Sequence, residues 1–231
     1  MKDILLLSSG IDSVVAWFYL GKPDCLHISG HSRYSEKEWN SLVDLSLKLK
    51  EMNLRIVSGQ NFLRQFEKEN AEIPGRNGLF CWIAASYGDI IHLPCQLGEQ
   101  SIPDRNPQNL DSLSSVLSIF YGSPKKIDIV FPDMTKQDIV KWALKNGVSK
   151  EILLSTYSCF NIGIGRCGEC EACARTAIAL EYSSILPEDF FVKNIWEWEG
   201  WNRYVPKLLA GEYEERRTKQ WLSVLERKLS K

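Results

Sequence analysis

Five short apolar runs alternate with amphipathic stretches over the first two-thirds of the chain. The runs lie at residues 3–7, 25–29, 54–58, 89–93 and 127–131. Their length and continuous apolar character are typical of strands buried in a parallel sheet. Helical spacing of apolar positions occurs between them, at residues 12–20, 36–50, 77–87, 107–120 and 135–146. This alternation predicts an α/β fold of three layers, with a mostly parallel sheet and helices on both faces.

The pattern changes beyond residue 150. We expect three parts, which are an α/β domain at residues 1–150, a cysteine-rich segment packed on it at 151–185, and a tryptophan-rich helical tail at 186–231. Ligands of parallel α/β sheets bind beyond the carboxyl ends of the strands. The turn after the first predicted strand lies at this edge. Four further loops belong to the same edge and begin near Ser29, Gly59, Pro94 and Pro132.

The turn after the first predicted strand has the composition of a phosphate-binding loop. It reads Ser8-Ser9-Gly10-Ile11-Asp12-Ser13 and leads directly into a predicted helix. Small residues let the chain turn tightly, and the unpaired N–H groups at a helix start attract an anion. The serine hydroxyls could add hydrogen bonds, and Asp12 could hold a metal ion or cap the helix. The string alone leaves open an ordinary strand, turn and capped helix.

Composition limits the classes of protein that the chain can represent. Its 231 residues are 44% hydrophobic and 25% charged, which is typical of a globular protein with a full core. No apolar run approaches the roughly 20 residues of a membrane-spanning helix, and Asp12 interrupts the first run before it could serve as a secretory signal. We therefore expect a cytoplasmic protein. A formal net charge of −1 argues against binding to a nucleic-acid backbone.

Four of the seven cysteines form a cluster in the sequence. They are Cys159, Cys167, Cys170 and Cys173. Four thiolates around a tetrahedral ion make a closed structural zinc site, which would fix the loop against the sheet. An iron–sulfur cluster is the main alternative, although Ala177 and Ile178 stand where the bacterial ferredoxin run has Cys and Pro. Reduced thiols without metal are a third alternative. The spacing favours zinc.

Several motifs follow one another in a definite order between residue 4 and about residue 182. They are the turn at residues 8–13, Ile73-Pro74-Gly75-Arg76-Asn77, Thr135-Lys136-Gln137-Asp138-Ile139-Val140, Tyr157-Ser158-Cys159 with the three later cysteines, and, as a weaker match, Pro103-Asp104-Arg105. In this order and spacing the chain resembles the 7-cyano-7-deazaguanine synthase (QueC) family, a branch of the PP-loop ATP pyrophosphatases. The resemblance implies a PP-loop adenine nucleotide alpha hydrolase-like fold, with residues 8–13 as the PP-loop.

The resemblance also implies an activity. Family members activate the carboxylate of 7-carboxy-7-deazaguanine by attack on the α-phosphorus of ATP, which releases pyrophosphate. An amine then displaces AMP from the acyl adenylate. With ammonia as the amine, the product is 7-cyano-7-deazaguanine (preQ0), a precursor in queuosine biosynthesis. ATP, Mg²⁺ and Zn²⁺ are the implied cofactors.

The implied site residues come from the same motifs. The nucleotide-binding set is Ser8, Ser9, Gly10, Ile11, Asp12, Ser13, Ile28 and His31. The catalytic set is Asp12, Ser13, Arg76 and Lys136, and the set that binds the deazaguanine is Arg76, Asn77, Asp104 and Arg105. By this resemblance Asp12 would bind Mg²⁺ and Lys136 would neutralise phosphate charge. Lys136 could equally be a solvated lysine, and Arg76 and Asn77 could simply begin a helix.

Three segments depart from the family pattern. Ser9 replaces the first glycine of the usual Ser-Gly-Gly loop. The backbone dihedral angles at this position must therefore be ones that a non-glycine residue can adopt. Residues 30–36 are rearranged, and residues 98–102 lack the expected aromatic and glycine residues. The last two segments belong to the loops expected to face the acyl substrate.

The tail contains four of the eight tryptophans. Clustered aromatic rings flanked by charge can form a recognition surface for a partner protein. They can also pack the tail onto the sheet or across the seam of a homodimer. The sequence leaves these alternatives open. Nearly balanced acidic and basic residues in the tail argue against nucleic acid as a partner.

Three functions remain open at this stage. The first is a ligase that uses ammonia to make the nitrile. The second, suggested by QueC-like members of antiphage operons, conjugates the deazaguanine to an amino group of a partner protein. A PP-loop enzyme of tRNA thiolation is more remote and would need a labile thiol at Cys81 or Cys95. Cys81 lies among apolar residues of a predicted helix, which predicts a buried, inert thiol.

Overall fold

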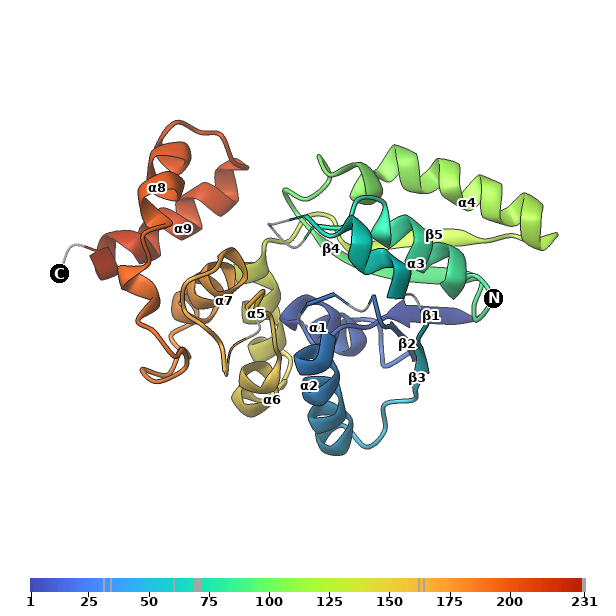
Figure 1. The fold of residues 1–231 in the computed structure, drawn as a ribbon, viewed down its shortest axis with the longest axis horizontal. Coiled ribbons are helices and arrows are strands. Elements are labelled where there is room, and N and C mark those ends of the chain that lie inside the picture. The colour runs from blue at the N-terminus through green and yellow to red at the C-terminus, as the bar shows by residue number, and fades with distance from the viewer. Residues whose placement is uncertain are drawn as a thin grey trace.

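A parallel sheet of five strands forms the centre of the molecule (Figure 1). The computed structural model describes residues 1–30, 32–33, 35–59, 61–68, 72–161, 163 and 165–229. The strands are β1 (Asp3–Leu6), β2 (Asp24–Ile28), β3 (Leu54–Val57), β4 (Ile90–Gln96) and β5 (Lys126–Phe131). Every strand pair is parallel. The five strands predicted from the apolar runs are therefore confirmed.

The helices follow the predicted alternation. They are α1 (Ile11–Tyr19), α2 (Ser35–Lys48), α3 (Arg76–Ala84), α4 (Pro107–Tyr121), α5 (Lys136–Lys145), α6 (Lys150–Ser155), α7 (Glu171–Tyr182), α8 (Trp201–Leu209) and α9 (Glu215–Leu229), with 3-10 turns η1 (Asn61–Phe66), η2 (Pro103–Arg105) and η3 (Ile195–Glu197). Helices α1 to α5 confirm the five predicted stretches. Within the described ranges, no helix is both long and apolar enough to cross a membrane.

Two apolar layers cover the sheet, one on each face. On one face α1, α2, α5, α6 and α7 bury a cluster that includes Trp17, Val140 and Ala179. On the other face α3 and α4 bury Cys81 and Leu117 against the strands. Figure 1 shows α3 and α4 on the opposite side of the sheet from α1 and α2. The predicted three-layer architecture is confirmed, and burial of both faces explains why the strands read as continuous apolar runs.

The order of the strands places a cleft at one edge of the sheet. The order is β3-β2-β1-β4-β5, so the chain moves outward from β1 in one direction and later returns to continue on its other side. Within the sheet Leu5 of β1 pairs with both Cys25 of β2 and His92 of β4. The loops after β1 and β4 consequently leave in opposite directions. Ligands of α/β sheets bind at such a switch point, beyond the carboxyl ends of the strands.

The tail packs its aromatic rings inward. Trp201, Tyr204 and Trp221 are buried in a cluster with Ala177 and Ile178 of α7. The Trp221 ring lies 6.2 Å from the Trp201 ring and 5.8 Å from the Tyr204 ring, measured between centroids. Figure 1 shows α8 and α9 beside α7, at the end of the molecule away from the N-terminus. Of the alternatives left open by the sequence, packing within the chain is the one that these three rings adopt.

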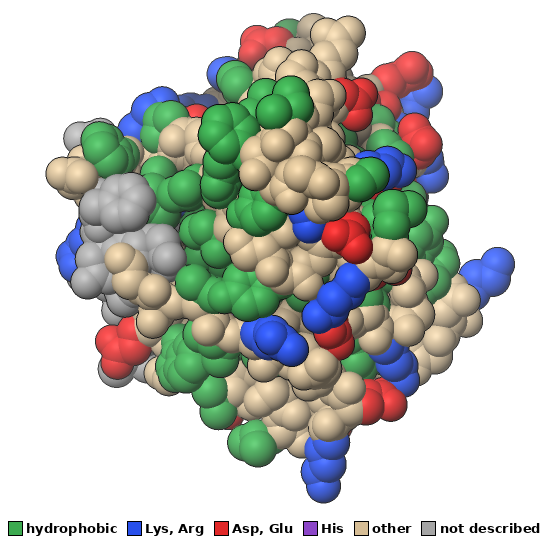
Figure 2. All heavy atoms as spheres, turned by 90° about the vertical axis from the view of Figure 1, so that its right-hand side faces the viewer, with side chains coloured by type: hydrophobic (Ala, Val, Ile, Leu, Met, Phe, Trp, Pro, Cys, Tyr) green, Lys and Arg blue, Asp and Glu red, His purple; other side chains and the backbone are tan. Residues whose placement is uncertain are grey.

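Figure 2 shows the face of the molecule at the end away from the tail. Hydrophobic side chains there are interrupted by basic and acidic ones. No single sign of charge covers this face, as expected for a chain with a formal net charge of −1.

Candidate functional site

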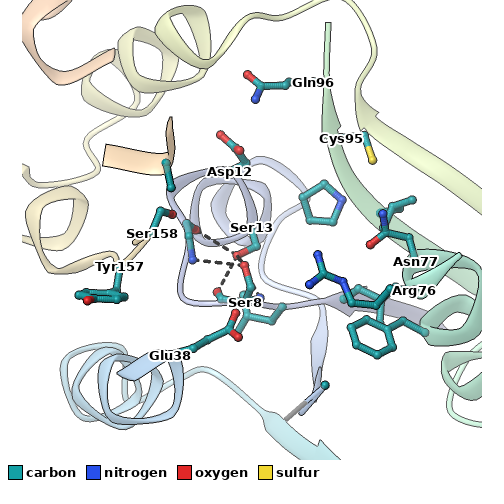
Figure 3. A pocket seen from close by; sticks show the side chains of 18 of the residues that line it. Ser8, Asp12, Ser13, Glu38, Arg76, Asn77, Cys95, Gln96, Tyr157 and Ser158 are labelled. Atoms are coloured by element: carbon teal, nitrogen blue, oxygen red, sulfur yellow. Dashed lines mark hydrogen bonds between the residues drawn. The ribbon is translucent and has the colours of Figure 1, made fainter. Parts of the chain in front are cut away.

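A cavity of about 280 Å³ opens at the carboxyl ends of β1, β2 and β4 (Figure 3). It collects side chains from motifs that lie far apart in the sequence. The predicted site residues that line it are Ser8, Gly10, Asp12, Ser13, Ile28, Arg76, Asn77, Arg105 and Lys136. Tyr157 and Ser158 of the fourth motif lie on the opposite side of the PP-loop from Arg76 and Asn77 (Figure 3). One cavity therefore unites the motifs on which the resemblance rests.

Four other predicted residues take different positions. Ser9 and Ile11 are buried and do not line the cavity. The Asp104 carboxylate accepts a hydrogen bond from the backbone N–H of Asn77 at 3.0 Å, and so stabilises the start of α3. His31 lies outside the described residues. A direct role in ligand binding for these residues stays a prediction.

The PP-loop is held in shape by its own hydroxyl groups. The Ser13 hydroxyl donates to the carbonyl oxygen of Ser8 at 2.6 Å and accepts from the Ser8 N–H at 3.1 Å. The Ser8 hydroxyl accepts from the Gly10 N–H at 3.2 Å, and Figure 3 shows bonds of this network within the cavity. No side chain of the described residues caps α1, and the first N–H groups of a helix have no partner within it. The loop thus presents a preformed set of donors to an anion.

Gly10 lies where a side chain would crowd this loop. A Cβ at Gly10 would lie 3.1 Å from the Ser158 hydroxyl oxygen and 3.4 Å from that of Ser8. The φ of Gly10 is −73°, which any residue can adopt. Close approach, and not the backbone angle, is therefore what favours glycine at this position.

Ser9 joins the PP-loop to the segment that leads into the cysteine cluster. Its hydroxyl donates to the carbonyl oxygen of Tyr157 at 3.0 Å, and the Tyr157 N–H donates to the carbonyl oxygen of Ser9 at 2.7 Å. Ser9 is not among the residues with positive φ. A serine consequently fits without strain where the family usually has glycine, and its hydroxyl adds a bond that glycine cannot make.

Lys136 and Asp12 form an ion pair at the cavity. Lys136 is the first residue of α5, and its Nζ donates to Asp12 Oδ2 at 2.6 Å. Their side chains are only 12% and 20% exposed. The second carboxylate oxygen, Asp12 Oδ1, is buried and has no hydrogen-bond partner among the described residues. Carboxylate oxygens are the ligands that Mg²⁺ prefers, so Asp12 suits a role at a nucleotide-bound Mg²⁺.

A second ion pair lines the cavity, between Glu99 and Arg105, whose atoms Oε1 and Nη1 lie 2.6 Å apart. Burial by itself would raise the pKa of the Glu99 carboxyl, but the charges of Arg105, Lys136 and Arg175 outweigh burial and lower this pKa. Glu99 is therefore ionised at neutral pH. Glu99 was not predicted as a site residue, because no sequence motif marks it.

Arg175 and Thr176 of α7 also line the cavity and were not predicted. The signal for Arg175 was its place two residues after Cys173, the last cysteine of the cluster. Among the described lining residues the cationic side chains are Arg76, Arg105, Lys136 and Arg175, and the carboxylates are Asp12, Glu38 and Glu99. The small excess of cationic side chains over carboxylates, together with the N–H donors of the PP-loop, favours anionic ligands.

The four cysteines of the cluster meet in space. Their sulfur atoms all lie within 4.8 Å of one another, and those of Cys167 and Cys173 are 3.8 Å apart. A tetrahedral zinc ion with Zn–S bonds of about 2.3 Å separates its sulfur ligands by about 3.8 Å. The Glu169 and Cys173 N–H groups donate to the sulfurs of Cys167 and Cys170, at 3.3 and 3.5 Å. The donor set and its spacing fit a single metal ion.

The cysteine cluster and the cavity share α7. The Cys170 residue caps the start of this helix, and Cys173 lies in its first turn. Cys159 lines the cavity, as do Arg175 and Thr176. An ion held by the four sulfurs would therefore fix the helix that carries Arg175.

Cys81 and Cys95, the two candidate sulfur carriers, are buried. Burial raises the pKa of Cys81 to about 12, and it raises the pKa of Cys95 as well. Thiols that do not ionise near neutral pH are poor nucleophiles. The predicted buried thiol at Cys81 is confirmed, and the environment of both residues argues against a tRNA thiolation role.

Fold and site together define a doubly wound α/β protein with a cavity lined by cationic side chains next to a cluster of four cysteines that could hold a metal ion. Residues 2–183 match the family described as "Queuosine biosynthesis protein QueC". The match extends over most of the chain, and the chain belongs to the QueC family. The resemblance drawn from the motifs is confirmed.

Curated relatives have named activities. The 7-cyano-7-deazaguanine synthase of Methanobrevibacter smithii is 32% identical over 121 residues, which cover 49% of this chain and 51% of that protein. The chain thus spans about half the length of this relative. The synthase of the same name from Thermoplasma acidophilum is 27% identical over 203 residues, covering 74% of this chain and 84% of that protein. Because both relatives are synthases, they support the conclusion that this chain is an enzyme.

One solved structure is also similar. It is the U34-tRNA thiolase NcsA from Methanococcus maripaludis with its [4Fe-4S] cluster. The TM-score is 0.45 at 14% sequence identity, with 89% of this chain and 73% of that chain covered.

Proposed function

We propose that the chain is an ATP-dependent ligase that adenylates the carboxylate of 7-carboxy-7-deazaguanine and transfers the acyl group to ammonia. The observation that carries this proposal is the single cavity that unites the PP-loop, the Lys136–Asp12 pair, and Arg76 and Asn77 of α3. Two relatives named 7-cyano-7-deazaguanine synthase support the choice of substrate. The final product is 7-cyano-7-deazaguanine.

The PP-loop binds the phosphates of ATP in this proposal. The free N–H groups at the start of α1 and the Ser8 hydroxyl contact the β- and γ-phosphates, which become pyrophosphate. Lys136 moves its Nζ from Asp12 to the phosphates and stabilises the charge that develops as the bond to pyrophosphate breaks. Asp12 would hold a Mg²⁺ ion, which would supply further neutralisation of phosphate charge.

The acyl substrate binds on the α3 side of the cavity. Arg76 pairs with its carboxylate, and Asn77 contacts the base. A carboxylate oxygen attacks the α-phosphorus, the bond to pyrophosphate breaks, and an acyl adenylate forms. The nitrogen of ammonia then attacks the acyl carbon, and AMP leaves with the bridging oxygen to give the amide. A second ATP takes up the amide oxygen in the same way, and loss of AMP and two protons leaves the nitrile.

We also infer that the four cysteines hold a structural zinc ion. Four protein ligands leave no open position for a reacting water molecule. Sulfur atoms within 4.8 Å of one another enclose one ion. An iron–sulfur cluster would have to place several irons and sulfides between the same four thiolates. The ion's role is to fix α7, and Arg175 with it, against the cavity.

Isotope exchange between ATP and pyrophosphate tests the first half-reaction without regard to the amine. We expect exchange in the presence of 7-carboxy-7-deazaguanine and none without it. Adding ammonium should then give the amide and the nitrile, identified by mass spectrometry. Acid-dependent exchange without these products would refute ammonia as the amine while leaving the adenylation intact. Absence of exchange with the acid present would refute the adenylation itself.

A further inference from the structure

The C-terminal helix α9 contacts the start of α5 from outside the part of the chain that matches the QueC family. That match ends at residue 183, whereas α9 comprises Glu215–Leu229. The first residue of α5 is Lys136, whose amino group reaches the cavity. An element beyond the family match therefore lies against the helix that presents a proposed catalytic group.

Gln220 makes the central contact. Its side-chain N–H donates to Asp138 Oδ1 at 2.8 Å, and its side-chain carbonyl accepts from the Thr135 hydroxyl at 2.6 Å. Gln220 is 7% exposed and Thr135 is 1% exposed. The Thr135 hydroxyl has a second acceptor in Asp138 Oδ2, at 2.8 Å, so the group that loss of Gln220 deprives of a donor is Asp138 Oδ1. Gln220 is thus tied to Thr135, directly before Lys136, and to Asp138, two residues after it.

Thr135 and Asp138 are themselves the capping box of α5. The Thr135 hydroxyl accepts from the Asp138 N–H at 3.2 Å, and Asp138 Oδ2 accepts from the Thr135 N–H at 3.1 Å. A capping box fixes where a helix begins and in which direction the chain enters it. Because Gln220 bonds to both members, it holds the first turn of α5 and the backbone of Lys136 in place.

Arg216, one helical turn before Gln220, adds a second attachment. Its guanidinium lies 3.0 Å from Asp138 Oδ2 and donates to the carbonyl oxygen of Asp133 at 3.2 Å. The Arg216 side chain is 54% exposed, so water weakens this contact relative to those of Gln220. Gln220 is consequently the stronger of the two attachments.

The start of α9 also covers the turn that precedes Glu99. A Cβ at Gly98 would lie 3.6 Å from Glu214 Cβ and 3.9 Å from the Arg217 guanidinium. Arg217 is held over the rings of Tyr213 and Trp221, at 5.2 and 4.9 Å from their centroids. One helix therefore contacts both segments that present Lys136 and Glu99 to the cavity.

We propose that Gln220 is a positioning residue that fixes Lys136 through the capping box of α5, so that the tail completes the site. The catalytic consequence rests on the proposed function, whereas the placement of Lys136 does not. Lysine is a long, flexible side chain, so its amino group reaches Asp12 reproducibly only if its backbone is fixed. Misplacement of a catalytic group by about 1 Å can lower a rate by roughly 100-fold.

The variant Gln220→Leu tests the proposal, because leucine has a similar size and makes no hydrogen bonds. Arg227→Ala is the matched control, since Arg227 is exposed on the same helix. The first measurement is the rate at which acetic anhydride acetylates Lys136 in the intact protein, quantified by mass spectrometry. Lys145, exposed at the other end of α5, is the internal reference. Because the pair with Asp12 protects Lys136, we expect several-fold faster labelling of Lys136 in Gln220→Leu alone.

The second measurement is acid-dependent ATP–pyrophosphate exchange, well below the melting temperature of each variant. We expect Gln220→Leu to lower kcat roughly tenfold or more, with a smaller change in the KM for the acid. Unchanged labelling of Lys136 in a folded Gln220→Leu protein would overturn the positioning role. Faster labelling with unaltered exchange would instead support positioning and contradict the catalytic role proposed for Lys136.

The variant Gln220→Glu supplies a rescue test. When ionised, the new carboxylate repels Asp138, and this repulsion raises the pKa of the new carboxyl group. When protonated, the carboxylic acid can donate to Asp138 and accept from Thr135 as the amide does. We therefore expect labelling of Lys136 in Gln220→Glu to approach the wild-type rate as the pH is lowered, with no such trend in Gln220→Leu. The same pH response in both variants would contradict the proposal.

Discussion

Lys136 Nζ lies 2.6 Å from Asp12 Oδ2, although the two residues are 124 positions apart in the chain. The contact joins the first residue of α5 to the first turn of α1, directly at the PP-loop. In the ligand-free protein each charge neutralises the other at a mostly buried position. In the proposed function, the oxygens of a triphosphate would compete for the lysine, and the carboxylate would become available to a metal ion. Without a ligand, Asp12 therefore pairs with the same lysine charge that is proposed to bind phosphate.

Replacement of Lys136 by alanine should abolish most of the first half-reaction. Removing one preorganised donor to a developing negative charge costs about 10²–10³ in rate. We expect a loss of this size in acid-dependent ATP–pyrophosphate exchange for Lys136→Ala. Lys145→Ala is the control, because Lys145 lies exposed in the last turn of the same helix. Equal exchange rates in the two variants would exclude Lys136 from the mechanism.

Replacement of Gly10 by alanine should weaken ATP binding more than it weakens the fold. The new methyl group would press on the Ser158 hydroxyl at 3.1 Å and narrow the approach to the loop. We expect the KM for ATP to rise on the order of tenfold, which is about 1.4 kcal/mol of binding free energy. The φ of −73° suits alanine, so the melting temperature should change little.

Gly78→Ala is the control for this variant. A Cβ at Gly78, inside α3, would make only an ordinary contact of 3.8 Å with Leu113. Alanine is the better helix former, so this variant should be slightly stabilised and keep its KM for ATP. If both alanine variants shifted the KM for ATP equally, crowding at the PP-loop would not be the cause.

The sequence predicts the scaffold better than it predicts the cavity walls. Continuous apolar runs mark β1 and β2 because both faces of the sheet are buried. The predicted fourth strand ends at residue 93, before Pro94, whereas β4 continues to Gln96 through an irregular register with β5. Proline lacks the N–H that a strand ladder uses, so the sequence indicated a strand end at this point. In the folded protein, pairing with β5 carries the strand past the proline.

Two contacts at the site were not predicted from the sequence, because both depend on how the chain folds. Glu99 acts in the cavity only through its contact with Arg105 and the nearby charges of Lys136 and Arg175. The Ser9 hydroxyl has its partner 148 residues away, at Tyr157. A motif reports local chemistry at fixed spacing, and neither contact has one. Composition alone likewise did not decide whether the tail tryptophans pack inward, because burial is a property of the fold.

Metal analysis tests the zinc assignment. We expect one zinc per chain, no absorbance of an iron–sulfur chromophore, and a lower melting temperature after chelation. Structural zinc sites contribute on the order of 10 kcal/mol to folding, so Cys173→Ser should lose metal and much of its stability. Cys95→Ala is the control, because Cys95 is buried outside the cluster and should leave the metal content unchanged. Iron with inorganic sulfide in the purified protein would contradict this assignment.

The Glu99–Arg105 pair should make stability depend on pH in the acid range. The pKa of Glu99 in the folded state is held below its usual value by neighbouring cations. Its stabilising contribution is therefore fully present above the usual glutamate pKa of about 4.3, and it is lost as the pH falls through the lowered value. Glu99→Gln removes this dependence and leaves the partly buried Arg105 without its carboxylate, at a cost of about 2 kcal/mol at neutral pH.

Urea unfolding at pH 7 and at several values below pH 4 measures the effect. The difference in unfolding free energy between the wild type and Glu99→Gln should be largest at pH 7 and should shrink as the pH falls, because protonated Glu99 no longer compensates the charge of Arg105. Glu226→Gln, an exposed change on α9, should show neither the large cost nor the convergence. A difference for Glu99→Gln that stayed constant down to pH 3 would mean that Glu99 has the same pKa in the folded and unfolded states, and would contradict the lowering of its pKa by the neighbouring cations.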